Sequence, residues 1–195
     1  MGILGQATFK MEYLDIVDEN AEPTGATVER GEAHRKGILH RTSHVWLLRR
    51  RNGRVQILLQ LRSKEKVSWA GCYDISSAGH IPAGDGFVES ALRELQEELG
   101  ITASAEELMP CGDRRFVFGY EYRGEKFIDN QISRVFALWR DTDECDITIQ
   151  QSELDGVLWI DFDECVHKVE NNLFRHCIVM EELDMLRQVI ETGNR

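Results

Sequence analysis

Long apolar segments are missing from this sequence. No run approaches the roughly 20 residues that are needed to cross a membrane. Residues 1–10 also lack the basic start and the apolar core of a signal peptide. We therefore predict no membrane partner, and we interpret residues 1–10 as a flexible leader.

Basic residues are scarce relative to acidic ones. Lys and Arg number 23 against 34 Asp and Glu, which gives a formal net charge of −11. Such a charge argues against binding to a nucleic acid polymer or to an anionic membrane surface. It still permits a small anionic substrate, because a divalent cation and a few local basic residues can reverse the field inside one cleft.

The five cysteines show no pairing pattern. Their number is odd, and no two of them have the C-x-x-C spacing of zinc or redox sites. A disulfide framework is therefore not expected, and reduced thiols indicate a cytoplasmic protein.

The pattern of apolar residues predicts strands and one strong helix. The turn signal Arg51-Asn52-Gly53 joins two strand-like segments, residues 42–49 and 55–61, into a hairpin. Apolar residues at helical spacing predict an amphipathic helix over residues 87–99, which ends at Gly100.

The rest of the chain alternates in the same way. Further strands are expected at residues 73–77, 115–122, 127–139 and 157–160, and further helices at 161–169 and 175–192. This order predicts an α/β protein of the α+β type, with a mixed β-sheet sandwiched between helices. We expect one domain over residues 11–195, with an N-terminal extension and a C-terminal helix. Base rates permit a homodimer.

An acidic strip follows one side of the predicted helix 87–99. Glu94 and Glu98 stand one turn apart, and Glu97 lies beside them. Taken alone, such a string is typical of a solvated acidic face. However, like charges at this spacing repel, and a hard cation such as Mg²⁺ removes the repulsion, prefers oxygen ligands and binds phosphates. The residues around the strip therefore distinguish a solvated acidic face from a Mg²⁺ site.

Residues 79–101 resemble the Nudix box. The box has the form G-x5-E-x7-R-E-U-x-E-E-x-G-U, where U is a bulky aliphatic residue. Gly79 and Asp85 stand at its first two defined positions, and the segment Arg93-Glu94-Leu95-Gln96-Glu97-Glu98-Leu99-Gly100-Ile101 completes it. Every defined position matches except that Asp85 replaces Glu. The resemblance implies the Nudix fold and the hydrolysis of a diphosphate linkage in a small molecule.

The resemblance also implies roles for individual residues. Glu94, Glu97 and Glu98 would bind the catalytic Mg²⁺ or Mn²⁺, with Glu97 and Glu98 closest to the chemistry. Arg93 would orient one of these carboxylates, unless it forms only a surface ion pair. Asp85 would join the metal site from the preceding loop, although its side chain is one methylene shorter than the family's Glu.

A second resemblance extends from about Leu14 to Trp159. The segments at residues 14–20, 33–41 and 59–66 are similar to isopentenyl-diphosphate isomerase, which shares the Nudix fold. The isomerase needs a Cys where this chain has Ala78, and a carboxylate pair in E-x-E spacing where this chain has Asp129-Asn130-Gln131. The residues therefore favour hydrolysis over isomerisation.

The isomerase resemblance also implies binding residues. Its histidine metal ligands match His34, His40 and His80, with weakened acidic partners, so a partial zinc-like site remains open beside the interpretation of polar turn residues. Arg62 and Lys66 match positions that contact the substrate diphosphate. The alternative is that they are only solvent-exposed basic residues at the end of a strand. His80 is expected to face the cleft.

Two further residues complete the predicted site. Trp69 would line the cleft or belong to the core. Glu153 lies on a loop where some Nudix enzymes place a general base, and we assign it that role. Three hypotheses result: a Mg²⁺-dependent diphosphate hydrolase, which we prefer, an isomerase, and a silent nucleotide-binding module. The sequence does not identify the substrate.

Overall fold

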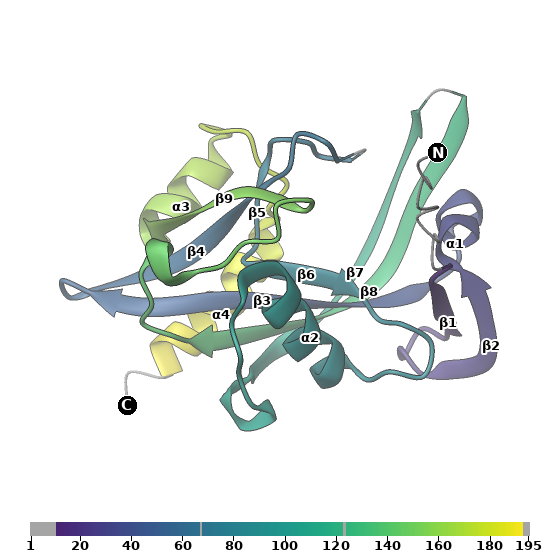
Figure 1. Cartoon of the computed structure of the whole chain (residues 1–195), viewed down its shortest axis with the longest axis horizontal. Coiled ribbons are helices and arrows are strands. Elements are labelled where there is room, and N and C mark those ends of the chain that lie inside the picture. Colours follow the sequence, from purple (N-terminus) through teal and green to yellow (C-terminus); the bar gives the residue numbers. More distant parts are fainter. Residues whose placement is uncertain (1–10, 67, 123, 193–195) are drawn as a thin grey trace, which may run out of the picture.

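The structure is a computed structural model that describes residues 11–66, 68–122 and 124–192 (Figure 1). The expected leader at residues 1–10 lies outside the described residues. In chain order the strands and helices are β1 (Tyr13–Val17), β2 (Pro23–Glu29), α1 (Arg30–Lys36), β3 (His40–Arg51), β4 (Arg54–Arg62), β5 (Tyr73–Asp74), β6 (Ser77–His80), α2 (Phe87–Leu99), η1 (Ala105–Glu107), β7 (Met109–Tyr122), β8 (Glu125–Trp139), η2 (Glu144–Asp146), β9 (Leu154–Asp161), α3 (Phe162–Glu170) and α4 (Met180–Thr192). No described helix combines the length and the apolar character that are needed to cross a membrane.

The N-terminal extension is an ordered unit. β1 and β2 pair in antiparallel fashion as a two-stranded sheet, and α1 follows at once. The side chain of Glu29 caps α1 by accepting from the backbone N–H groups of Gly31 and Glu32. Gly37 ends the helix with φ 65°, and a Cβ at this position would lie 2.8 Å from the Ile128 side chain. This tight stop places α1 against β8, which it packs on.

β3 is the central strand of a seven-stranded mixed sheet. Its order is β5-β4-β3-β8-β7, and β9 pairs with β4. β3 and β8 run parallel, which confirms the expected mixed sheet. The other edge of β3 pairs with two different strands. β6 pairs with residues 42–45 of β3, and β4 pairs with residues 48–51. β4 and β6 therefore diverge, and this opens the sheet near its centre.

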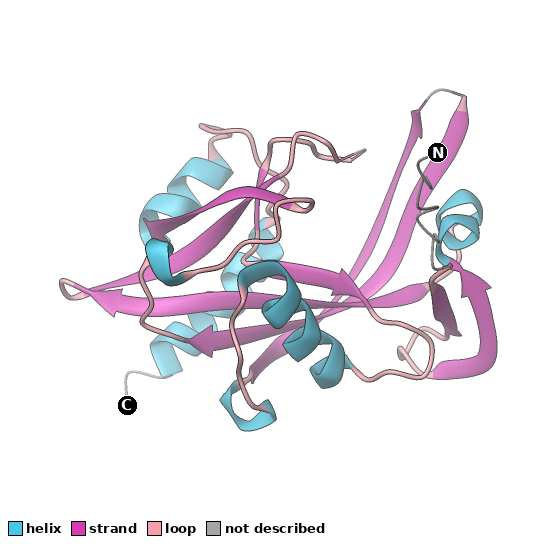
Figure 2. Ribbon diagram, viewed as in Figure 1, coloured by secondary structure: helices cyan, strands magenta, loops and turns pink. Residues whose placement is uncertain are grey.

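Helices cover both faces of this sheet (Figure 2). Val45 and Leu47 of β3 pack with Leu95 and the rest of the α2 core on one face. Trp46 and Leu48, which alternate with them, pack with α3 and α4 on the other face. The expected sandwich is confirmed. Successive side chains of β3 point to opposite faces of the sheet, and this alternation fixes which of them can reach each helix.

Most predicted elements form, and α2 has the bounds that the sequence predicts. The hairpin turn at Asn52 and Gly53 uses left-handed backbone at both residues, with φ of 52° and 74°. The strand expected at residues 73–77 is instead two short strands, β5 and β6.

The closing helix was predicted to start at residue 175 and begins at Met180. The backbone just before Met180 forms hydrogen bonds with β5 instead of helical ones. The carbonyl of Arg175 accepts from the N–H of Tyr73, and the N–H of Cys177 donates to the carbonyl of Tyr73. This segment pairs with the sheet edge at β5 and so cannot be helical.

The β7–β8 hairpin is much longer than predicted. β7 begins at Met109, six residues before the expected start, and the two strands pair from there to Tyr122 and Glu125. Figure 1 shows the hairpin extending beyond the rest of the sheet, next to α1. One face of this extension forms a wall of the site described next.

Candidate active site

One large cavity, about 940 Å³, lies where β4 and β6 diverge. Its walls come from α1, α2, the β7–β8 hairpin and the loops after β4 and before β9. Nine of the ten residues predicted to act in catalysis, magnesium binding or substrate binding line it, namely Arg62, Lys66, Trp69, His80, Arg93, Glu94, Glu97, Glu98 and Glu153. The fold thus brings together residues that are up to 91 positions apart in the sequence.

Asp85 is the exception. It is exposed in the loop before α2, and it is not among the residues that line the cavity. Its backbone carbonyl accepts from Arg41, while no described residue hydrogen-bonds to its carboxylate. The structure therefore does not bring Asp85 to Glu94, Glu97 and Glu98 of α2.

Glu94, Glu97 and Glu98, the three glutamates of the motif on α2, differ in exposure. Glu98 is only 6% exposed and accepts from the Ser77 hydroxyl at 2.8 Å and from the Ala78 N–H at 3.3 Å. Burial raises the pKa of Glu98 to about 7. The neighbouring Glu94 raises this pKa further, whereas the hydrogen bonds from Ser77 and Ala78 lower it. Glu97, in contrast, is half-exposed. The cluster therefore combines one buried carboxylate with one that faces solvent.

Arg93 holds two of these carboxylates. Its Nη1 lies 2.9 Å from Glu94 and 3.1 Å from Glu97, and its Nη2 donates to the carbonyl of His80 at 3.3 Å. The guanidinium thus ties the acidic helix to β6. Burial still raises the pKa of Glu94, although Arg93 opposes the shift.

Gly79 explains why the motif needs a glycine. It pairs with Ser43 in the β3–β6 ladder, and a Cβ at this position would lie 2.1 Å from Cδ of Glu94. Real Cβ atoms do not come this close to another atom, so any larger residue would displace Glu94. Gly100, at the other end of α2, ends the helix in left-handed backbone with φ 66°.

The predicted phosphate-binding residues have partners within the protein. Arg62 donates to Asp74 at 3.1 Å and to the carbonyl of Ser68 at 3.2 Å. Lys66 contacts Glu153, so the predicted base and the predicted phosphate ligand form an ion pair. Burial lowers the pKa of Lys66. Both cations line the cavity, Arg62 from the end of β4 and Lys66 from the loop that follows it.

Aromatic rings form the outer wall of the cavity. Trp69 is 43% exposed, so it belongs to this wall and not to the core. Its ring lies 5.3 Å from that of Phe118, and Phe118 is followed along the wall by Tyr120 and Phe127. Flat rings in succession can hold a planar or an apolar part of a ligand.

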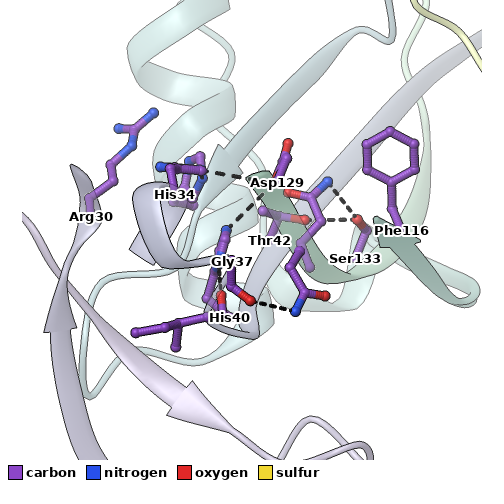
Figure 3. Close-up of polar contacts among 12 residues, drawn as sticks. Arg30, His34, Gly37, His40, Thr42, Phe116, Asp129 and Ser133 are labelled. Carbon is purple, nitrogen blue, oxygen red and sulfur yellow. Dashed lines mark hydrogen bonds and ion pairs between the residues drawn. The ribbon is translucent and has the colours of Figure 1, made fainter. Parts of the chain in front are cut away.

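A second cluster lies at the end of the cavity near α1. His34 of α1, His40 of β3, His80 of β6 and Asp129 of β8 place one ligand atom each within 4.8 Å of one another. Figure 3 shows His34 and His40 converging on Asp129. The Asp129 carboxylate lies 3.9 Å from Nε2 of His34 and 3.7 Å from Nε2 of His40.

Burial disfavours the protonated, charged forms of the histidines in this cluster. Burial lowers the pKa of His34 to about 4, and burial also lowers the pKa values of His40 and His80. His40 donates its Nδ1–H to the carbonyl of Ile38, so its Nε2 carries a lone pair. Nε2 of His40 and Oδ1 of Asp129 are buried and have no hydrogen-bond partner among the described residues.

The sequence pointed to the three histidines but undervalued Asp129. Its short side chain predicts a weakened acidic partner, whereas β8 brings Asp129 directly to the imidazoles. A buried polar network beneath the cavity, which joins His44, Trp46 and Arg114 to Glu182, was not predicted at all. Glu182 is 138 residues from His44, and no local motif marks it.

Comparisons with known proteins agree with this geometry. A family model described as the NUDIX domain matches residues 39–178. Nudix hydrolase 3 of Arabidopsis thaliana is 39% identical over 157 residues, which are 78% of this chain and 20% of that protein. An uncharacterized Nudix hydrolase of Clostridium acetobutylicum is 33% identical over 162 residues, which are 83% of this chain and 76% of that protein.

The isomerase likeness also has a counterpart among known proteins. The isopentenyl-diphosphate Delta-isomerase of Pectobacterium atrosepticum is 41% identical over 86 residues, which are 44% of this chain and 46% of that protein. In fold, the chain is similar to a crystal structure from Deinococcus radiodurans, with a TM-score of 0.64 and 18% identity, covering 90% of this chain and 98% of that one. The chain spans only a fifth of the Arabidopsis relative, so the activity of that whole protein does not transfer directly.

Proposed function

Because the chain belongs to the Nudix family of hydrolases, we propose that it cleaves a diphosphate linkage in a small molecule with the help of a divalent cation. One observation carries the proposal. Glu94, Glu97 and Glu98 of α2 lie in the same cavity as two cations, Arg62 and Lys66, that suit phosphate oxygens. Such a cavity matches a ligand that bridges a metal-binding end and a basic end.

The α2 carboxylates fit a hard cation. Glu98 is buried and Glu94 largely so, and burial raises the pKa values of both, so a bound cation would stabilise their ionised forms. We therefore assign Mg²⁺ or Mn²⁺ to Glu94, Glu97 and Glu98. When bound, the cation would supply positive charge that offsets the charge of the diphosphate and activate water for attack.

The residues of the chain would do the remaining work. Arg93 orients Glu94 and Glu97 through its contacts with both. Arg62 and Lys66 would hold the distal phosphate. A phosphate that binds Lys66 would release Glu153 from its ion pair, and Glu153 would then be free to accept a proton from water. Trp69 would cover the remainder of the substrate.

The histidine cluster supports a second metal ion of another kind. Three neutral imidazoles and one carboxylate are a donor set for a transition metal such as zinc, and its orphaned Nε2 and Oδ1 atoms support this assignment. His34, His40, His80 and Asp129 would hold this ion. It lies in the same cavity as the glutamates, since both His34 and His80 line that cavity.

The two alternatives receive less support. Ala78 and Gln131 line the cavity where an isomerase of this family needs a Cys and a carboxylate, and neither an alanine nor an amide can transfer the required proton. A silent binding module would not need three glutamates at the cavity wall, one of them buried at a cost in free energy.

The test is turnover on a substrate panel. The protein is incubated with Mg²⁺ and nucleoside triphosphates, nucleotide sugars, dinucleotide cofactors or isopentenyl diphosphate, and the release of phosphate, diphosphate or phosphomonoesters is measured. We expect release from one class. Glu98→Gln should lower it by about 100-fold or more, because the variant removes a metal-binding charge.

A matched control makes this result specific. Glu89→Gln changes an exposed glutamate of α2 that does not line the cavity, and it should leave activity unchanged. Equal losses in both variants would contradict the assigned role of Glu98. Tight nucleotide binding without release would favour the binding module, and double-bond migration in isopentenyl diphosphate would favour the isomerase.

A further inference from the structure

A buried carboxylate lies at the floor of the cavity, on the sheet face that α4 covers. Glu182, in the first turn of α4, is only 1% exposed. Its Oε1 accepts from Nδ1 of His44 and from Nε of Arg114, both at 2.9 Å, and its Oε2 accepts from Nε1 of Trp46 at 2.9 Å. Both carboxylate oxygens are thus fully engaged by side chains of β3 and β7.

This carboxylate stays ionised. Burial alone would raise the pKa of Glu182, but the adjacent His44 and Arg114 outweigh that effect and lower it to about 2. A buried ion pair of this kind is weak evidence for stability, because desolvation can cancel its Coulombic gain. Its location beneath an open cavity therefore suggests that it positions one of its partners for a ligand.

Arg114 is that partner. It is 5% exposed, lines the cavity, and uses only Nε to reach Glu182. Its two terminal amino groups have no hydrogen-bond partner among the described residues, its charge opposes the rise that burial causes in the pKa of the nearby Asp129, and the centroid of the Phe116 ring lies 4.8 Å from its Cζ. Glu182 on one side and Phe116 on the other fix the plane of the guanidinium. The result is a rigid fork of N–H donors at the cavity floor.

The surroundings of this fork are polar. Gln131 lies in the same part of the cavity, where it donates to the Ser133 hydroxyl at 3.3 Å, and Thr42 donates to the same hydroxyl at 2.8 Å. Figure 3 shows Phe116, Thr42 and Ser133 gathered in this region. A hydrocarbon tail placed here would leave these groups and the guanidinium without water and without partners.

We propose that Arg114, held by Glu182, is a specificity-determining residue that binds an oxygen-bearing group of the substrate outside its diphosphate. The shared chemistry is an acceptor oxygen, supplied either by a carbonyl on a planar ring or by a second phosphate. The inference rests on the proposed function only in assigning the diphosphate to the α2 side. Glu182 acts through Arg114 and is a positioning residue.

The test is equilibrium binding by calorimetry, with Ca²⁺ in place of Mg²⁺ to suppress turnover. The probes are inorganic pyrophosphate, isopentenyl diphosphate, uridine diphosphate, adenosine diphosphate and phosphoribosyl diphosphate. We expect uridine diphosphate or phosphoribosyl diphosphate to bind about tenfold or more tightly than pyrophosphate, and isopentenyl diphosphate not to. A gain for uridine over adenosine diphosphate identifies a ring carbonyl, and a gain for phosphoribosyl diphosphate identifies a phosphate.

The variants separate a specific role from a loss of folding. Arg114→Met should abolish the gain over pyrophosphate and leave the affinity for pyrophosphate itself unchanged. Arg114→Lys keeps a cation beside Glu182 but loses the fork, so most of the gain should also disappear. Glu182→Gln should reduce the gain by a smaller factor. Arg115→Met is the matched control, since Arg115 is the next residue of β7 and does not line the cavity.

Three results would overturn the proposal. The first is that no probe with an acceptor oxygen outside its diphosphate binds more tightly than pyrophosphate. The second is that Arg114→Met weakens all probes equally, which would mean a structural role. The third is that isopentenyl diphosphate shows the largest gain. Failure of hydrolysis in the activity assay would leave these binding comparisons intact, so the two proposals fail separately.

Discussion

The two groups of candidate metal ligands in the cavity are built in opposite ways. Glu94, Glu97 and Glu98 come from one stretch of one helix, and two of them already contact a cation, Arg93. The histidine cluster comes from four elements, and two of its donor atoms have no hydrogen-bond partner among the described residues. Carboxylates that already contact an arginine do not need a permanently bound metal, so their metal can bind together with the substrate. Neutral donors that converge without a partner are preorganised for an ion that stays bound.

The largest expected effect comes from breaking the glutamate group without touching a glutamate. Gly79→Ala places a methyl group where Glu94 now lies, and Glu94 must leave. We expect a loss of about 100-fold in kcat/KM, since a displacement of about 1 Å at a reacting centre can cost that much. Thermal stability should change little, because Gly79 does not need positive φ.

Gly119→Ala is the control for this variant. Gly119 lies in β7, and a Cβ there would meet no atom of another residue closer than 3.8 Å. Its activity should match that of the wild type. A Gly79→Ala enzyme with full activity would show that the position of Glu94 is not critical.

The second effect concerns the histidine group. His40→Asn removes the donor whose Nε2 is buried without a partner, so the bound transition metal should fall by about tenfold or more after dialysis. Elemental analysis of the purified protein measures it directly. His167→Asn, at an exposed position of α3, should keep the wild-type content. Equal metal content in all three proteins, or none in any, would contradict the assignment.

The smallest effect is a pH dependence of the unfolding free energy that comes from Glu98 of the glutamate group. The pKa of Glu98 is raised in the folded protein, so its protonated form is favoured, and folding is disfavoured progressively as pH rises from the unfolded pKa to about 7. Without divalent cations, the wild type should lose on the order of 3 kcal/mol over this window relative to Glu98→Gln. Mg²⁺ should restore part of it at the upper end.

Denaturant unfolding between about pH 4 and pH 8 measures this difference. Glu182 contributes in the opposite sense, since its lowered pKa makes its stabilisation disappear only at acid pH, but both proteins share it. Parallel pH profiles for the wild type and Glu98→Gln would show that Glu98 is not strained by burial.

The sequence predicted what is local and missed what depends on topology. The helix 87–99, its terminating Gly100 and the hairpin at Asn52-Gly53 follow from spacing and turn chemistry, and all three are confirmed. The helix start at residue 175 was wrong because that segment pairs with the β5 edge, which no periodicity in the segment reveals.

The candidate site divides in the same way. The glutamates and Arg93 follow from one motif, and their neighbours Arg62, Lys66 and Glu153 lie in the same cavity as expected. The placement of Asp129 among the histidines depends on the parallel register of β3 and β8, in which His40 stands beside Gln131. Glu182 reaches β3 only because α4 packs on the sheet, and Asp85 is an exposed residue of the loop before α2 that does not line the cavity.

The most direct test of the central claim is a labelling experiment on the wild-type protein. The best substrate from the panel is turned over with Mg²⁺ in ¹⁸O-labelled water, and the products are analysed by mass spectrometry. Hydrolysis predicts one labelled oxygen in a released phosphoryl product, and no label when Mg²⁺ is chelated. Turnover that leaves the diphosphate intact and shifts a double bond, or no turnover on any diphosphate tested, would contradict the account.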